Sequence, residues 1–157
     1  MVTLHFYQDT DTDNQRIAHY QLTNPSFTAT PQQALAQAST DPDRLPVLAL
    51  QDNELVGFFV LVKSAGVNEV GADPRTAILI RSLSVSEAYR HQGVATQMMT
   101  VLPDFVRQAF PEVKELTLSV DHGNVAAQKL YAKLNYLDTG RRRYGRYGEQ
   151  YVLAYRL

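Results

Sequence analysis

The chain is organised around one short stretch, Arg90-His91-Gln92-Gly93-Val94-Ala95-Thr96. An apolar run, residues 77–85, precedes it, and apolar residues recur at spacings of three and four through residues 94–109. This pattern predicts a strand, a short loop and then a helix. A helix begins with backbone N–H groups that lack internal partners, and its dipole adds partial positive charge there. The stretch is therefore typical of an anion-binding loop.

Three residues in this stretch favour a phosphate as the anion. Gly93 and Ala95 are small, so a phosphate can approach the backbone N–H groups closely, and Arg90 adds a full positive charge. A pyrophosphate is the ligand we expect. The chain contains neither G-x-G-x-x-G nor G-x-x-x-x-G-K-[ST], the two familiar nucleotide-binding patterns. An ordinary strand-to-helix turn built on a glycine is the alternative.

Length and composition predict a soluble globular protein with one domain covering residues 1–157. Of its 157 residues, 45% are hydrophobic and 20% are charged, as is usual for such domains. The sequence has no apolar run long enough for a membrane span, and its first residues do not resemble a signal peptide. It has no cysteine, which excludes disulfide bonds and a cysteine nucleophile. We expect a cytoplasmic protein without a metal or a membrane partner.

The net charge of −1 is divided unevenly along the chain. Residues 1–80 hold nine acidic and four basic side chains, whereas residues 81–157 hold seven acidic and eleven basic ones. The basic part contains the proposed anion site, as an anionic ligand would favour. Arg141, Arg142, Arg143 and Arg146 also suggest a nucleic-acid surface, but a pI near 6.4 argues against it. We expect a solvated hairpin or a phosphate-facing edge there, and no nucleic-acid partner.

In the first part of the chain, alternation predicts a strand over residues 2–7. Residues 9–14 begin like a calcium loop but lack its glycine and its final glutamate. Their carboxylates are predicted to cap and start a helix that reaches Tyr20. Attraction of an amine substrate is the alternative role. Thr30 and Pro31 predict the start of a second helix, which continues to Ala38.

The middle of the chain predicts two strands, residues 46–50 and 55–63, joined by a hairpin turn. Residues 64–76 are predicted to form a surface loop before the 77–85 strand. Pro103 should kink or divide the helix at 94–109, because proline removes one helical hydrogen bond.

The last part of the chain predicts one more helix and three strands. Residues 115–120 alternate as a strand, and Asn124 is placed to cap a helix that ends near Leu134. A strand beginning at Tyr136 and a last strand at 151–155 are joined by a hairpin tip at 144–148.

Two motifs resemble those of the GNAT superfamily of N-acetyltransferases. The first, Arg90-x-x-Gly93-x-Ala95, looks like the R/Q-x-x-G-x-G/A motif of that superfamily. The second is Asn124-x-x-Ala127-x-x-x-Tyr131-x-Lys133-x-x-Tyr136. Asn135 stands where the superfamily has glycine, and asparagine can also adopt the left-handed conformation that ends a helix. The motifs lie on their expected elements, and the order of elements extends the resemblance over the whole chain.

The resemblance implies an α+β fold of the α/β three-layer kind, with a mixed, mostly antiparallel sheet of about seven strands and about four flanking helices. It implies acetyl-CoA as cosubstrate, without a metal. The 83–85 backbone would hold the pantetheine arm and the thioester carbonyl, N–H groups of residues 91–96 would bind the pyrophosphate, and Asn124 would contact the arm. The implied cofactor-binding residues are Leu83, Ser84, Val85, Arg90, His91, Gln92, Gly93, Val94, Ala95, Thr96, Asn124 and Tyr131.

The resemblance also implies that an amine attacks the thioester directly in a ternary complex, with Tyr131 as general acid for the departing thiolate. A thiol has a pKa of about 8.5 and a phenol of about 10, so partial proton transfer already helps. A tyrosine that only packs on the sheet is the alternative. The general base stays open, because the 77–85 strand lacks the glutamate of many relatives. Glu87, His122 and a water chain are the candidates.

The leading hypothesis is an acetyl-CoA-dependent N-acetyltransferase that acts on a small-molecule or peptide amine. The alternative is a non-catalytic acyl-CoA-binding or regulatory module with the same fold. The architecture implies that the acceptor is selected by three segments, the loop at 23–27, residues 64–76 and the hairpin tip at 144–148. The tyrosine-rich last strands would also suit a homodimer.

Overall fold

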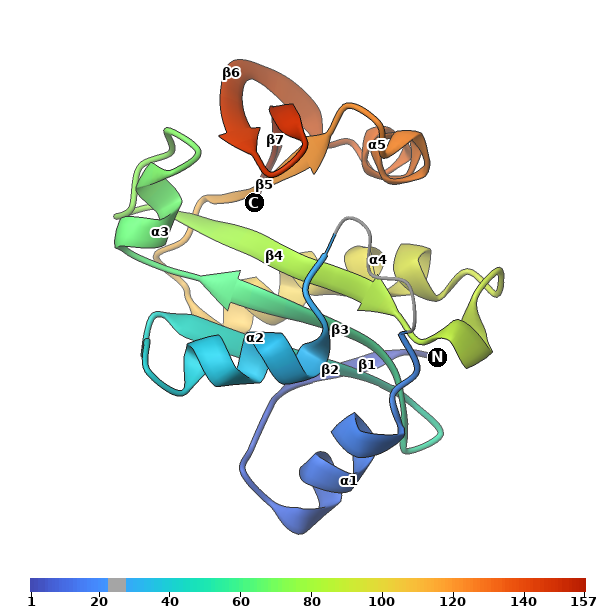
Figure 1. The fold of residues 1–157 in the computed structure, drawn as a ribbon. Helices are drawn as coiled ribbons and strands as arrows, with labels where there is room; N and C mark the ends of the chain where they lie inside the picture. The colour runs from blue at the N-terminus through green and yellow to red at the C-terminus, as the bar shows by residue number, and fades with distance from the viewer. Residues whose placement is uncertain (23–27) are drawn as a thin grey trace. The chain divides into compact units, whose positions relative to one another are not determined.

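The computed structural model describes residues 1–22 and 28–157, so the predicted acceptor loop at 23–27 lies outside the described residues. Hydrogen bonds order seven strands as β1-β2-β3-β4-β5-β7-β6 (Figure 1). These strands are β1 (Thr3–Phe6), β2 (Arg44–Gln51), β3 (Glu54–Val62), β4 (Ala77–Val85), β5 (Glu115–Asp121), β6 (Leu137–Gly145) and β7 (Gly148–Arg156). The helices described are α1 (Asp11–His19), α2 (Pro31–Ala38), α3 (Ala65–Asn68), α4 (Val94–Ala109) and α5 (Val125–Lys133), with a 3-10 turn, η1 (Glu87–Tyr89).

The sheet is mixed, as predicted. Strand β4 pairs with β5 in parallel, whereas β1 with β2, β5 with β7 and β6 with β7 pair antiparallel. Together with the five described helices, this confirms the predicted α+β, three-layer class. None of the helices in the described part of the chain is long and apolar enough to span a bilayer.

The chain forms two compact units, and each is described by itself below. The N-terminal unit consists of Met1–Leu61 and Ser82–Leu102, and the C-terminal unit of Val62–Arg81 and Pro103–Leu157. Strand β4 and helix α4 therefore each begin in one unit and end in the other.

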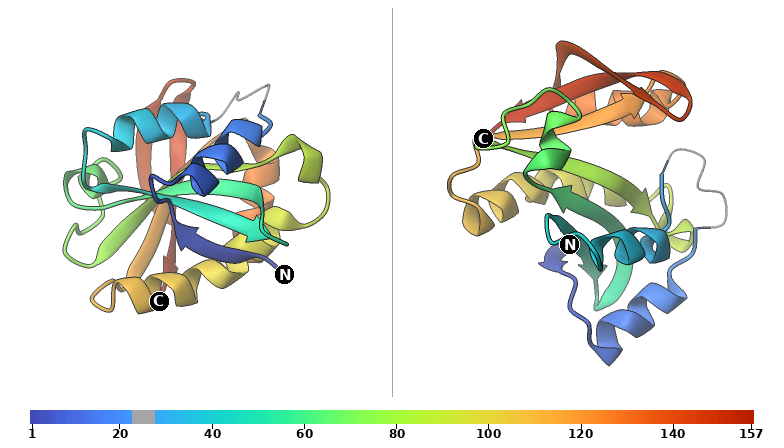
Figure 2. Two further views of the ribbon diagram at one scale, coloured as in Figure 1. Left: turned by 90° about the horizontal axis from the view of Figure 1, so that it is seen from below. Right: turned by 60° about the vertical axis from the view of Figure 1, so that its left-hand side comes forward.

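The core of the N-terminal unit is built on the β2–β3 hairpin. The predicted hairpin turn consists of Asp52 and Asn53, whose φ values of +52° and +66° are those that a two-residue hairpin turn requires. Apolar side chains of both strands, such as Leu48, Phe58 and Phe59, are fully buried. Helices α1 and α2 lie on one side of this hairpin and the first half of α4 on the other (Figure 2, left).

Helix α1 begins where the carboxylates predicted it. Thr10 is the N-cap and accepts a hydrogen bond from the Asp13 N–H. The Asp13 side chain is buried, and its oxygens accept from the Gln8 N–H at 2.9 Å and from Arg16 Nη1 at 2.9 Å. His5 Nε2 lies 3.3 Å from the same carboxylate. Burial alone would raise the Asp13 pKa, but these hydrogen bonds and the His5 charge outweigh it and lower the pKa.

Replacement of Asp13 by Asn is expected to lower the free energy of unfolding by about 2–3 kcal/mol at neutral pH, because the Gln8 N–H and Arg16 lose their charged, buried acceptor. The pKa of Asp13 is lower in the folded protein than its value of about 3.9 in the unfolded chain. The carboxylate therefore stabilises the fold fully at pH values above the unfolded pKa, and this contribution is lost as the pH falls through the folded pKa. Urea unfolding should therefore show a large difference at pH 7 that shrinks below about pH 4. The exposed Asp11→Asn is the control, and an equal loss in both variants would contradict this.

One sequence prediction is wrong in part: residues 64–76 are predicted to form a loop, but Ala65–Asn68 form the short helix α3. Of the two effects predicted for Pro103, a kink or a division of its helix, division is excluded, because α4 continues through it from Val94 to Ala109. The apolar side chains on both sides of the proline, Met98, Leu102 and Val106, are completely buried. Packing of this face outweighs the loss of one helical hydrogen bond.

In the C-terminal unit, β5 pairs with β7 without interruption from Glu115↔Arg156 to Asp121↔Gln150. Because side chains alternate along a strand and directly opposed residues share a face, this register defines two faces. One, the α5 face, carries Leu116, Leu118, Val120, Tyr151, Leu153 and Tyr155. The other, the second face, carries Thr117, Ser119, Asp121, Gln150, Val152 and Ala154.

Helix α5 lies on the α5 face. The ring of Tyr131 is 5.8 Å from that of Tyr136, which is 5.4 Å from the Tyr155 ring. The helix is capped by Leu134, and the next residue, Asn135, has a φ of +71°, which confirms the predicted left-handed residue. Both Tyr131 and Tyr136 therefore share a face with Tyr155, opposite to Asp121.

Candidate active site

The predicted anion loop belongs to the N-terminal unit, between η1 and α4. Arg90 follows η1, and the backbone then takes positive φ at His91 (+62°) and Gly93 (+76°) before α4 begins at Val94. Residues 90–93 are exposed. The Gln97 N–H donates to the Gly93 carbonyl at 3.0 Å and closes the first turn of α4. The N–H groups that a helix start leaves without internal partners are thus next to an exposed loop.

Gly93 lies in open surroundings. A Cβ added there would meet no atom within 4 Å, so the backbone around it is open. Its φ of +76° is one that residues with side chains rarely adopt. Open backbone, a positive-φ turn and a helix dipole are the features that a pyrophosphate needs. The residues of this loop therefore fit the pyrophosphate that the sequence pattern assigns to them.

The end of β4 is fixed by its side chains. The Ser84 hydroxyl is buried and lies 2.7 Å from the Tyr20 hydroxyl, and burial raises the pKa of Tyr20. Leu83 and Val85 are half-buried, and alternation directs their side chains to the face opposite Ser84. Ser82, with φ of +57°, interrupts the regular strand geometry just before them. The Ser84 hydroxyl is engaged with Tyr20, so the backbone is what this residue offers a ligand.

The Tyr20–Ser84 hydrogen bond is expected to contribute about 1 kcal/mol to stability. Tyr20→Phe and Ser84→Ala should each lower the free energy of unfolding by about this amount or slightly more, because one buried hydroxyl is left unpaired. The double variant should lose much less than the sum of the two. Urea unfolding of the four proteins measures this coupling, and additive losses would contradict it.

Helix α5 of the C-terminal unit is anchored to the end of β5. Asn124 caps the helix, and its Oδ1 accepts from the Ala127 N–H at 3.3 Å, which confirms the predicted cap. Gln128 Nε2 donates to the carbonyls of Asp121 and His122, each at 2.9 Å. The second motif therefore starts its helix at a fixed position beside the last residue of β5.

Tyr131 is held on the same helix. It is only 7% exposed, and burial raises the pKa of its phenol to about 12. The hydroxyl therefore keeps its proton throughout the physiological pH range and can donate a hydrogen bond.

The structure places the base candidates in different surroundings. His122 Nε2 lies 3.5 Å from Glu149 Oε1, and its ring stacks on Tyr151 at 4.1 Å. His122 is thus on the α5 face, with Tyr131. Glu87 is the first residue of η1, in the N-terminal unit.

The arginines of β6 are engaged within the C-terminal unit. Arg142 bonds to Asp138 at 2.8 Å and lies over the Tyr151 ring. Arg143 bonds to Glu69 at 3.3 Å, and Arg141 Nε donates to the Val70 carbonyl at 3.0 Å. These contacts hold Arg141, Arg142 and Arg143 in place on the hairpin.

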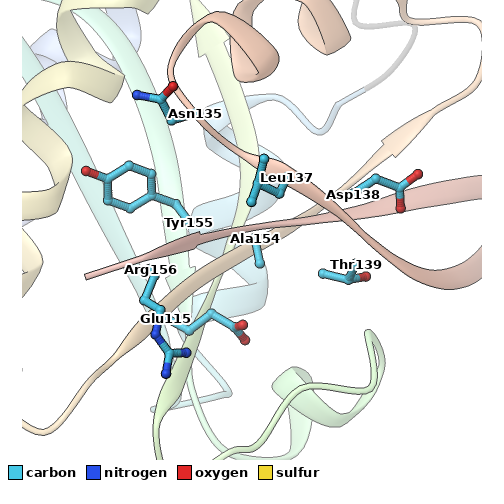
Figure 3. A pocket seen from close by; sticks show the side chains of 8 residues that line it. All are labelled: Glu115, Asn135, Leu137, Asp138, Thr139, Ala154, Tyr155 and Arg156. Carbon is cyan, nitrogen blue, oxygen red and sulfur yellow. The ribbon is translucent and has the colours of Figure 1, made fainter.

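A hollow of about 420 Å³ lies at the other end of β5. Its lining residues are Glu115, Asn135, Leu137, Asp138, Thr139, Ala154, Tyr155 and Arg156 (Figure 3). In the figure the Tyr155 ring points away from Glu115 and Arg156, as alternation along β7 requires. Glu115 and Asp121 are the first and last residues of β5, so this hollow is separate from the Asn124 end. In the described part of the chain, no group of three His, Cys, Asp or Glu side chains could hold a metal ion.

Comparison with known proteins identifies the family. Residues 6–136 match the acetyltransferase (GNAT) family, and this range includes parts of both units. The chain is also 40% identical over 136 residues to YbbJ of Bacillus subtilis (strain 168), an uncharacterised N-acetyltransferase, with 85% of each chain covered. The chain belongs to the GNAT acetyltransferase family. The predicted resemblance is confirmed.

Solved structures show the same fold. The crystal structure of a GNAT family acetyltransferase from Elizabethkingia anophelis, with acetyl-CoA bound, matches with a TM-score of 0.67 and 17% identity, covering 99% and 98% of the two chains. The aminoglycoside acetyltransferase AAC(6')-Ib, in complex with coenzyme A and kanamycin, matches with a TM-score of 0.75 and 18% identity, covering 99% and 95%. Both neighbours were thus crystallised with acetyl-CoA or coenzyme A.

Two features of this GNAT family member are not among the sequence predictions. The Tyr20–Ser84 hydrogen bond joins residues 64 positions apart, and no local pattern signals it. Asp121 lies just beyond the strand predicted at 115–120, but it is the buried last residue of β5. The sequence does carry one signal for this: Asp121 continues the alternation of Thr117 and Ser119, which places it on the same face of the strand.

Proposed function

We propose that this chain transfers the acetyl group of acetyl-CoA to a primary amine of a small molecule or peptide, by direct attack in a ternary complex. The observation that carries the proposal is the exposed loop at the start of α4, with an open positive-φ glycine next to the first turn of the helix, whose N–H groups have no acceptor within a helix. Membership of the GNAT family and neighbours solved with acetyl-CoA or coenzyme A support the choice of cosubstrate.

We assign the binding of acetyl-CoA, which supplies a reactive acetyl thioester, to residues of this chain. Backbone N–H groups of His91, Gln92, Gly93, Val94, Ala95 and Thr96 would hold the pyrophosphate, with Arg90 adding positive charge. The backbone of Leu83, Ser84 and Val85 would hold the pantetheine arm and the thioester carbonyl, and Asn124 would contact the arm.

Tyr131 is the group we assign to the leaving thiolate. Its buried, protonated phenol can donate a hydrogen bond to sulfur as negative charge develops there. Because burial raises the phenol pKa to about 12, hydrogen bonding rather than early proton transfer is its main contribution. The proton that the amine loses would pass to His122, to Glu87 or to water.

Calorimetric titration of the folded protein with acetyl-CoA tests the first step of this proposal. Saturable binding with a stoichiometry near one is expected. No heat of binding from a folded protein would mean that the loop does not hold this cosubstrate, and the proposed function would then fail.

We keep three further sequence predictions as proposals. The chain forms a single domain, and the protein is located in the cytoplasm. It forms a homodimer through the last strands, where Tyr144 and Tyr147 are exposed. Light scattering at several protein concentrations measures the oligomeric state.

A further inference from the structure

Two carboxylates are buried among the residues that the structure describes, and they differ in their partners. Asp13 is 3% exposed and has the cationic Arg16 and the titratable His5 beside it. Asp121 is 7% exposed, and the side-chain partner recorded for it is the neutral amide of Gln150, whose Nε2 donates to Oδ1 at 3.0 Å. A buried carboxylate is costly unless a cation or several donors compensate it. The site of Asp121 is therefore suited to a cation from outside the chain.

The position of Asp121 is fixed by a line of hydrogen bonds across the second face. Gln150, which donates to Asp121, accepts from Arg143 Nη1 at 3.1 Å. Arg143 Nη2 bonds to Glu69 Oε2 at 3.3 Å, and Arg81 Nη1 bonds to the same oxygen at 3.2 Å. The Asp121 carbonyl accepts from Gln128, so both its backbone and its side chain are held. A carboxylate has about four acceptor positions, and one hydrogen bond from Gln150 leaves acceptor capacity for a ligand N–H.

The faces of the sheet on which Asp121 and Tyr131 lie also bear on the role of Asp121. Asp121 is on the second face, whereas Tyr131 is on the α5 face. In a direct transfer, the incoming amine and the outgoing thiolate occupy different positions on the same carbon. The group that binds the amine and the group that donates to the thiolate must therefore approach this carbon from different directions. The two faces of the sheet provide these two directions. Residues 69–71, part of a segment that the sequence assigned to acceptor selection, contact the second face through Arg141 and Arg143.

We propose that Asp121 binds the cationic amine of the acceptor and thereby makes the enzyme selective for amines, a role that rests on the proposed function. The ligand class is a primary alkylammonium ion. The carboxylate accepts a charge-assisted hydrogen bond from the ammonium group, the kind of bond that is about twice as strong as a neutral one. The bound ammonium group then loses one proton, to His122, Glu87 or water, before its nitrogen has the lone pair that attacks the thioester.

The test measures steady-state thiol release from acetyl-CoA with kanamycin, spermidine, lysine and an alanine-starting peptide as acceptors. Asp121→Asn, which has the same shape without the charge, is expected to raise the KM of the best acceptor about 10- to 100-fold. The calorimetric Kd of acetyl-CoA should stay within about twofold of wild type, since Asp121 is not assigned to that ligand. Asp138→Asn removes an exposed carboxylate of the same unit and should change neither value.

The outcomes are distinguishable. A wild-type protein that neither binds acetyl-CoA nor releases thiol would end the proposed function and this role of Asp121 with it. An active wild type whose acceptor KM is unchanged in a folded Asp121→Asn would overturn the role of Asp121 alone. A measurement on the wild type needs no variant: an alcohol of the same skeleton should compete with the best amine about 10-fold or more weakly. Equal competition would also overturn it.

Discussion

Replacement of Tyr131 by Phe is expected to lower kcat about 100-fold while the Kd for acetyl-CoA changes little. The hydroxyl is the donor assigned to the developing thiolate, and removal of one such donor from an active site typically costs about 100- to 1,000-fold. The ring, which packs 5.8 Å from Tyr136, is kept in the variant, so the fold should not suffer. Thiol release under saturating acetyl-CoA and acceptor measures kcat, and calorimetry measures the Kd.

The matched control is Tyr136→Phe. Tyr136 is the neighbouring ring, equally buried, and its hydroxyl is buried without a hydrogen-bond partner in the described part of the chain. Its removal should leave kcat unchanged and should not lower the free energy of unfolding. Equal kcat values for wild type and Tyr131→Phe would remove Tyr131 from the mechanism.

Replacement of Gly93 by Glu is expected to weaken acetyl-CoA binding more than about 100-fold. The new carboxylate would stand at the helix start that is assigned to the pyrophosphate, and like charges in such a site repel each other. Residues with a side chain also adopt a φ of +76° only with strain, of about 1–2 kcal/mol. Calorimetric titration of the variant measures the affinity.

Gly140→Glu separates electrostatic repulsion from backbone strain. Gly140 has a φ of +81°, and an added Cβ would also meet no atom within 4 Å, but it lies on β6. This control should lose comparable stability and keep its affinity for acetyl-CoA. If both variants bind as the wild type does, the loop at 90–96 is an ordinary turn.

The sequence predicted the elements whose signals are local. The two-residue turn at Asp52 and Asn53, the caps at Thr10 and Asn124 and the left-handed Asn135 each follow from a residue's own conformational preference. The positive φ of Gly93 before α4 follows in the same way from the conformational freedom of glycine.

Features that depend on distant contacts were not predictable in this way. Helix α3 has four residues, too few for a helical period to be visible. The continuity of α4 through Pro103 depends on burial of Met98 and Val106, which a propensity rule does not include. Asp121 became a candidate only through its register with Gln150 and its burial.

The most direct test of acetyl transfer is to mix the wild-type protein with acetyl-CoA and the four-amine panel. Released thiol and acetylated product are then quantified together. We predict that thiol appears only when an amine is present and that each thiol is matched by one acetylated amine. The chain has no cysteine, so the protein itself adds no thiol background. Saturable acetyl-CoA binding without thiol release from any amine would contradict the enzyme account and favour a non-catalytic acyl-CoA-binding module.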